Sequence, residues 1–330
     1  MQAAIVGLAG PILRPEETAL LRAHPPAGVI LFARNIQEPP QLAALIAALR
    51  AVLRPEAHLM LDQEGGRVAR LRPPHWRAHP AAGAIGARYA ATPEAATRAA
   101  WLHGALIGAE AAQAGFDIVT APVLDRAVPG ASAVIGDRAF SPDPNAVAAL
   151  GRAMAEGLLA AGVIPVAKHI PGHGRATADS HYALPVVSAP DPEPDLLPFA
   201  LNADLPWAMT AHILFPAWDP TLPATLSPAV IGRIIRGRIG FEGALVTDDL
   251  AMRALTGAPE DLARAALAAG CDVALYCSGE YAPTAALLAA CPELTPQAAA
   301  RLAAARRRAA ASRRPLDPDA LGAERDRLLA

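Results

Sequence analysis

Residues 143–170 read DPNAVAALGRAMAEGLLAAGVIPVAKHI, and this stretch contains the pattern that decides the fold. Asp143 followed by Pro144 is typical of a helix start, because aspartate caps N–H groups and proline suits the first helical position. An alanine-rich segment of helical length follows, and Gly162 stands where helices commonly end in a left-handed residue. The run after Gly162 is apolar without alternation, as in strands buried on both faces. The stretch therefore predicts a helix, a glycine turn and a buried strand.

Strand-length runs of the same kind recur eight times along the 330 residues. Four of them begin with Ala-Gly, at Gly28, Gly115, Gly162 and Gly270, and each of these glycines is predicted to follow a helix in the left-handed conformation. Eight buried strands alternating with helices predict a (β/α)8 TIM barrel. The runs are AAIVGLAG (3–10), AGVILFARN (27–35), AHLMLDQEGG (57–66), AGFDIVTAPVLD (114–125), AGVIPVAKHI (161–170), LPWAMTAHILF (205–215), FEGALVTDDL (241–250) and AGCDVALYC (269–277).

The chain shows no linker that would divide it, so we expect one catalytic domain over residues 1–330. Residues 296–330 are predicted to form a helical tail, with the arginine run inside it as a solvated face. An open doubly wound sheet fits the same alternation of helices and strands. No GxGxxG motif follows any of the strands, however, which weakens a dinucleotide-binding interpretation.

Composition narrows the classes of partner and compartment. The net charge is -2 and no long basic face is present, so nucleic acid is not an expected partner. The three cysteines form no CxxC pair, which fits a reducing compartment better than a disulfide framework. The N-terminus lacks the basic region of a signal peptide, and no uninterrupted apolar stretch reaches membrane-spanning length. We expect a cytoplasmic monomer without a membrane partner.

Polar residues follow the predicted strands, at the barrel end where TIM-barrel enzymes carry their active sites. Charged groups on several strands would be costly to bury without partners or a function. These residues are Asp62, Gln63 and Glu64 with Arg67 and Arg70 after the third strand, Asp125, Asp137 and Arg138 after the fourth, Lys168 and His169 on the fifth, His212 after the sixth, and Asp248 and Asp249 on the seventh.

Carboxylates, guanidinium groups and imidazoles at one rim suit the hydroxyl groups of a sugar. Glycoside hydrolysis needs two ionisable groups beside the bond, one at the anomeric carbon and one that protonates the leaving oxygen. Asp248 or Asp249 can be the first, and strand alternation turns only one of them toward the barrel axis. His181 can be the second, because imidazole exchanges protons near neutral pH and Asp179 can fix its tautomer. The residues alone leave the choice between the two aspartates open.

Eight polar or glycine-containing segments follow one another along the chain: GVILFARN (28–35), LDQEGGRVARL (61–71), APVLD (121–125), IGDRAFSPDP (135–144), KHIPGHGRATADSHYALP (168–185), MTAHILFP (209–216), PATLS (223–227) and VTDDLAM (246–252). In this order they resemble the signature blocks of family 3 glycoside hydrolases, most closely the bacterial β-N-acetylglucosaminidases of peptidoglycan recycling (the NagZ type). Their joint occurrence is highly specific, and the resemblance covers roughly residues 1 to 290. The stretch RPPHWRAHP (72–80) departs from the usual family sequence.

The resemblance implies a retaining exo-β-N-acetylglucosaminidase that acts on muropeptides such as GlcNAc-1,6-anhydroMurNAc without a cofactor. It implies that Asp248 is the nucleophile, that His181 is the general acid/base and that Asp179 orients His181. Asp249 is then a structural neighbour. The sugar-binding positions that it implies are Asp62, Arg70, Arg138, Lys168 and His169.

Three alternatives remain at this point. A β-glucosidase or β-xylosidase of the same family would share the barrel and the nucleophile. A sugar-binding protein could use the same fold without catalysis, although both proposed reacting groups are present. A metal hydrolase would use His169 and His173, which have the spacing of a zinc pair on a helix. Pro171, Gly172 and Gly174 make a helix there improbable, so we expect no metal and assign His173 to anchoring the loop.

Overall fold

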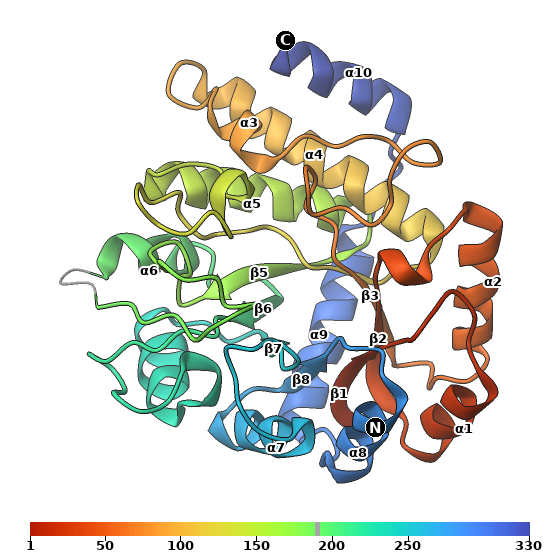
Figure 1. Ribbon diagram of the computed structural model, residues 1–330. Coiled ribbons are helices and arrows are strands. Elements are labelled where there is room, and N and C mark those ends of the chain that lie inside the picture. The colour runs from red at the N-terminus through yellow and green to blue at the C-terminus, as the bar shows by residue number, and fades with distance from the viewer. Residues whose placement is uncertain (189–191) are drawn as a thin grey trace.

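Eight parallel strands close into a barrel in chain order in the computed structural model, which describes residues 1–188 and 192–330 (Figure 1). Strand β1 pairs with both β2 and β8, so the barrel prediction is confirmed and the open sheet is excluded. The strands are β1 (Gln2–Gly7), β2 (Pro26–Leu31), β3 (His58–Leu61), β4 (Ile118–Val119), β5 (Ile164–Ile170), β6 (Trp207–Thr210), β7 (Ala244–Asp249) and β8 (Val273–Tyr276).

Helices surround the barrel and connect its strands. Across the described residues, none of them is both long enough and apolar enough to span a membrane. They are α1 (Pro15–Ala23), α2 (Pro39–Arg50), α3 (Ala82–Gly86), α4 (Pro93–Ala114), α5 (Pro144–Ala160), α6 (Glu193–Ala200), α7 (Pro259–Ala269), α8 (Tyr281–Ala290), α9 (Pro296–Ser312) and α10 (Pro318–Leu329), with 3-10 turns η1 (Ala33–Asn35), η2 (Gly136–Arg138) and η3 (Ala224–Leu226) and the π-helix η4 (Val230–Arg238).

The helix ends follow the sequence signals with one exception. Asp143 caps α5 by accepting the N–H of Asn145, and Gly115, Gly162 and Gly270 have φ values of 98°, 82° and 117°. The prediction for Gly28 is wrong, because this residue lies inside β2. A side chain there would meet the carbonyl oxygen of His58 at 2.5 Å, so the glycine permits close approach of β2 and β3.

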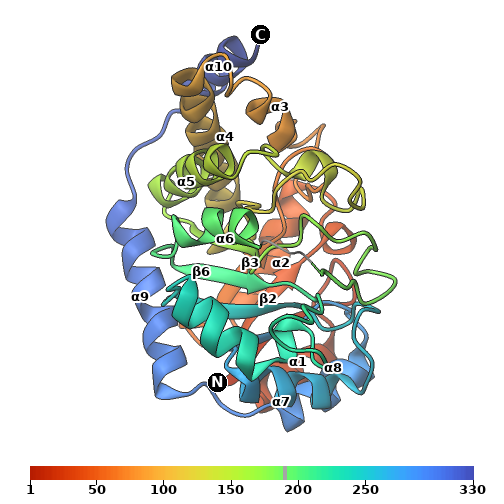
Figure 2. The same ribbon diagram turned by 90° about the vertical axis from the view of Figure 1, so that its left-hand side faces the viewer.

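Helix α9 closes the end of the barrel away from the long loops (Figure 2). Its residues Leu302, Ala305 and Ala309 pack into the same buried cluster as the inward-facing strand side chains. Three arginines of this helix are partly exposed and also bond to the barrel, so the predicted solvated face is only part of their role. Each of them donates to backbone carbonyl groups at that end: Arg301 to Glu242, Arg306 to Pro55 and Glu56, and Arg308 to Asp204.

Helix α10 lies against α4, on the side of the barrel that carries α3 (Figure 1). Arg98 of α4 forms a two-pronged ion pair with Glu324 of α10, with both N···O distances at 2.8 Å. The last helix of the described chain is therefore docked on the barrel periphery, far in sequence from the elements that it contacts.

Candidate active site

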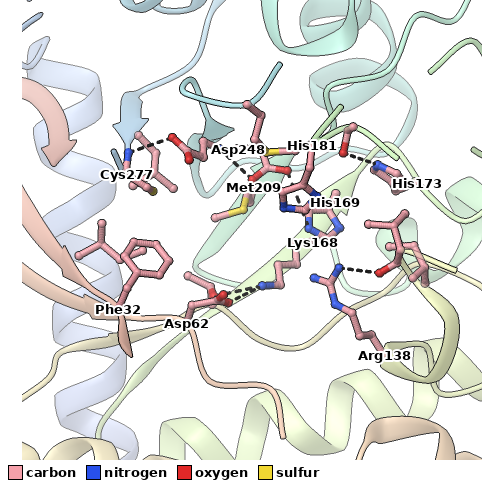
Figure 3. A pocket seen from close by; sticks show the side chains of 18 of the residues that line it. Phe32, Asp62, Arg138, Lys168, His169, His173, His181, Met209, Asp248 and Cys277 are labelled. Carbon is pink, nitrogen blue, oxygen red and sulfur yellow. Dashed lines mark hydrogen bonds and ion pairs between the residues drawn. The ribbon is translucent and has the colours of Figure 1, made fainter. Parts of the chain in front are cut away.

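A cavity opens at the carboxyl ends of the strands, where the sequence predicted the site (Figure 3). Seven of the eight predicted site residues line it, and the eighth, Asp179, bonds to His181. The polar part of the wall comprises Asp62, Arg70, Thr120, Arg138, Lys168, His169, His173, Ser180, His181, Asp248 and Asp249, and the apolar part includes Ile30, Phe32, Met209, Met252, Leu275 and Cys277.

The two neighbouring aspartates of β7 have different surroundings. Ala244 and Val246 face the barrel interior, and Asp248 continues that inward series. Its Oδ2 lies 4.0 Å from Nε2 of His169. Asp249 also reaches the cavity wall, but its Oδ1 accepts the backbone N–H groups of Ala251 and Cys277, each at 2.9 Å. The geometry thus ties Asp249 to the backbone and leaves Asp248 facing the cavity.

The pKa values of these two carboxyl groups are shifted in opposite directions. Burial opposes the charge on Asp248, but His169, His212, the Asp249 backbone N–H and Lys168 together lower its pKa from the ordinary value. Burial is the largest influence on Asp249 and raises its pKa. An anion at Asp248 is consequently favoured at neutral pH.

Residues 171–182 form an irregular loop after β5 that carries Asp179 and His181 to the cavity. Oδ1 of Asp179 accepts both the backbone N–H of His181, at 2.9 Å, and its Nδ1–H, at 2.7 Å. The His181 side chain is 59% exposed, whereas His173 is buried and contacts the Ser180 hydroxyl at 3.1 Å. With Nδ1 committed to Asp179, Nε2 of His181 is the nitrogen that can exchange a proton with a ligand.

Asp125 is a buried carboxylate behind the cavity that sequence reasoning left without a role. Its Oδ2 accepts Nδ1–H of His169 at 2.6 Å, and its Oδ1 accepts the backbone N–H of His173 at 2.6 Å. Burial opposes its charge, but the charges of His169 and His173 and the hydrogen bonds from both residues together lower the pKa of Asp125. Asp125 therefore fixes the His169 ring and anchors the loop, which agrees with the predicted anchoring of His173.

Two carboxylates of the β3 end hold the three cations of the site. Nζ of Lys168 lies 2.9 Å from Asp62 and 2.5 Å from Glu64 (Figure 3 shows the Asp62 contact). Arg70 pairs with Asp62 at 2.5 Å, and Arg138 forms two 2.8 Å bonds with Glu64. Burial opposes the charge on Asp62, yet Lys168 and Arg70 together lower its pKa well below the ordinary value. The charges are thus mutually compensated and fixed in place.

Lys168 and His169 both face the cavity although they are adjacent in β5. The pairing of β5 with β6 shifts in register between Lys168 and Ile170, which breaks the regular alternation at this point.

Glu64 is 5% exposed and does not line the cavity. In the sequence, only its position two residues after Asp62, on the same side of the chain, indicates a place near the site.

His212 follows β6 at the same end of the barrel, as predicted, but it is buried and does not line the cavity. Its Nε2–H donates to the Asp249 carbonyl at 3.0 Å, and its Nδ1 lies 2.7 Å from the Thr225 hydroxyl. Burial is the largest influence on His212 and lowers its pKa. Its contacts position the backbone of β7 at the two aspartates.

The spacing of His169 and His173 suggested a zinc pair on a helix, but the two rings lie on a strand end and an irregular loop. His169 and His173 lie with ring centroids 5.6 Å apart at an interplanar angle of 63°, and each faces a different partner. Within residues 1–188 and 192–330, no cluster of three or more His, Cys, Asp or Glu side chains is arranged to hold a metal ion.

Comparison with known proteins identifies a family whose sequence model matches this chain, and several similar proteins. The sequence model of the "Glycosyl hydrolase family 3 N terminal domain" matches residues 6–311. A protein named "Beta-hexosaminidase" from Alkalilimnicola ehrlichii is 44% identical over 295 residues, covering 86% of this chain and 82% of the relative. Another of that name from Aromatoleum aromaticum is 38% identical over 324 residues, covering 96% and 89% of the two chains.

A solved structure gives the same similarity in three dimensions. NagZ from Neisseria gonorrhoeae, in complex with N-trifluoroacetyl-D-glucosamine, superposes with a TM-score of 0.87 at 32% sequence identity. The match covers 100% of this chain and 98% of the other. The expected family resemblance is therefore confirmed over the whole barrel.

Proposed function

The chain belongs to glycosyl hydrolase family 3, and on that premise we propose that it is a retaining exo-β-N-acetylhexosaminidase. The observation that carries the proposal is the meeting of Asp248 and His181 in one cavity, with Asp179 bonded to the inner nitrogen of His181. The names of the relatives support the choice of a β-linked N-acetylhexosamine as the sugar.

In the first step of the proposed reaction, an oxygen of Asp248 attacks the anomeric carbon of the sugar. The bond from that carbon to the leaving oxygen breaks, and Nε2–H of His181 protonates this oxygen. Asp179 stabilises the imidazole orientation through its bond to Nδ1. The products of this step are the released aglycone and a glycosyl ester of Asp248.

In the second step a water molecule attacks the same carbon. Nε2 of His181 accepts a proton from the water, and the ester bond to Asp248 breaks, which returns both groups to their starting states. Two displacements at one carbon retain the anomeric configuration. Asp248 suits both steps, because its lowered pKa favours the carboxylate that must attack and later leave.

The polar network provides the binding part of the proposed site. Asp62, Arg70, Arg138, Lys168 and His169 present fixed donors and acceptors that match the hydroxyl groups of a sugar ring. Because these groups already hold one another in place, little side-chain freedom is lost when the sugar binds. We assign these five residues to sugar binding.

The aglycone and the setting belong to the same proposal. We assign a muropeptide as substrate, a monomeric state and a cytoplasmic location. All three cysteines, Cys271, Cys277 and Cys291, are buried free thiols, which is typical of proteins from reducing compartments.

A panel of chromogenic aryl β-glycosides tests this function. The N-acetylglucosaminide should be cleaved with a kcat/KM well above those of the glucoside and the xyloside, and Asp248→Ala should abolish its turnover. Faster cleavage of the glucoside or xyloside would assign the enzyme to another specificity of the family. No cleavage of any member by the folded protein would exclude the hydrolase.

A further inference from the structure

Helix α10 connects to the β3 end through buried side chains. Arg325 of α10 is only 2% exposed, and its Nη1 donates to Nδ1 of His79 at 3.0 Å. Because a guanidinium group only donates, Nδ1 is the acceptor and the ring proton of His79 lies on Nε2. That N–H donates to Glu110 of α4 at 3.0 Å. Arg325 thereby fixes the position and tautomer of a fully buried ring.

His79 in turn holds the segment Glu64–Gly66 by two routes. Its backbone carbonyl accepts the N–H of Gly66 at 2.9 Å. Its ring contacts the His103 ring edge-on, with centroids 5.6 Å apart, and Nε2 of His103 bonds the Glu64 carbonyl at 2.9 Å. Burial and His79 lower the pKa of His103 to about 3, so this ring is neutral and Nε2–H is the donor.

The backbone of residues 79–80 packs tightly against the segment Glu64–Gly66. A side chain at Gly65 would meet the Pro80 carbonyl oxygen at 2.3 Å and Cε1 of His103 at 2.9 Å. A shift of the 79–80 backbone must therefore move Glu64–Gly66 as well, because well-packed interiors transmit displacement.

Glu64 completes the path into the site. Its backbone is held by His103, and its carboxylate holds Arg138 and Lys168, which both line the cavity. We propose that α10 positions the sugar-binding cations of the proposed active site through Arg325, His79 and Glu64. Arg325 is thus a positioning residue outside the family match, which ends at residue 311, and this role rests on the proposed function.

Arg325→Met tests the proposal, since methionine fills similar space without a donor. The control is Glu324→Gln on the same helix, which weakens the pairing with Arg98 and leaves His79 untouched. Arg325→Met should raise KM for an aryl β-N-acetylglucosaminide about tenfold with a smaller change in kcat, and the control should stay within about twofold. Arg325→Lys keeps the charge and a donor and should restore most of the affinity.

A double-mutant cycle separates positioning from general destabilisation. If Arg325 acts through Glu64, the loss caused by Arg325→Met should shrink from about tenfold to about twofold or less in a Glu64→Gln background. Equal losses in both backgrounds would overturn the path through Glu64. All assays are run at a temperature where each variant is folded by circular dichroism.

Hydrogen exchange does not depend on activity. It therefore tests the contact of Arg325 with His79 even if the proposed glycosidase function is wrong. The Gly66 N–H should exchange faster in Arg325→Met than in wild type or Glu324→Gln, because its acceptor is the His79 carbonyl. Should Arg325→Met fail to fold, the comparison is made with Arg325→Lys, which should show a smaller increase. Unchanged exchange at Gly66 in the folded variant, together with an unchanged KM, would refute the proposal.

Discussion

Glu64→Gln is the substitution that most directly perturbs the polar network of the site. The side chain is nearly the same size, so the change removes charge without opening a cavity. In the native protein Glu64 bonds Arg138 twice at 2.8 Å and Lys168 at 2.5 Å. In the variant, Asp62 keeps its ion pairs with Lys168 and Arg70, whereas Arg138 loses the carboxylate that it pairs with.

The structure sets the size of the expected effects. Breaking a buried ion pair by removal of one partner destabilises a protein by about 3–5 kcal/mol. A single hydrogen bond to a charged group contributes about 1.5–3 kcal/mol, and losing one such bond from the positioning of the cations corresponds to about a 10- to 100-fold fall in kcat/KM. Burial opposes the charge on Lys168, and Glu64 is one of the two carboxylates that nonetheless raise its pKa.

Asp272→Asn is the matched control at the other end of the barrel. Asp272 is also a buried carboxylate with two cationic partners, Arg236 and Arg301, each at 2.9 Å. Both variants should lose stability in denaturant titrations, but only Glu64→Gln should lose kcat/KM on an aryl β-N-acetylglucosaminide. A Glu64→Gln enzyme within about twofold of wild-type kcat/KM would refute the positioning role of Glu64.

Three further outcomes are expected. His181→Ala should lower kcat/KM at least about 100-fold for a disaccharide but far less for an aryl glycoside with a good leaving group, and equal losses would argue against an acid role. Asp125→Asn should lower kcat/KM about 10- to 100-fold by releasing the His169 ring, whereas wild-type kinetics would exclude that positioning role. Burial lowers the pKa of His58 to about 4 and that of His103 to about 3, from 6.5 when unfolded. The unfolded state therefore binds more protons below pH 6.5, and each ring should cost about 2 kcal/mol of unfolding free energy between pH 7.5 and 5, a loss measurable by denaturant titration at both pH values.

The fold could be predicted because its signals are local and lie within one or two helical turns of the element that they mark. Aspartate and proline at 143–144 mark a helix start, Gly162 marks its end, and the apolar run after it forms β5. Gly28 shows the limit of this reasoning, because the same Ala-Gly pair lies within β2, where the neighbouring backbone, and not a helix end, requires a glycine.

Those residues of the candidate site that lie at strand ends could be predicted from the sequence. Asp62, Lys168 and Asp248 are such residues, and they line one cavity because all barrel strands are parallel. The contact of Arg325 with His79 spans 246 positions and depends on how α10 docks, so no local pattern encodes it. The bonds of the α9 arginines could not be predicted for the same reason, because their carbonyl partners belong to loops distant in sequence.

Trapping of the glycosyl-enzyme tests the central claim most directly. A 5-fluoro N-acetylglucosaminyl fluoride should label the protein covalently, because the ring fluorine slows both displacements whereas the good fluoride leaving group keeps the first faster than the second. Intact-mass and peptide mass spectrometry should place one glycosyl group on Asp248. An adduct on Asp249, or on neither aspartate together with inversion at the anomeric carbon, would contradict the proposed mechanism.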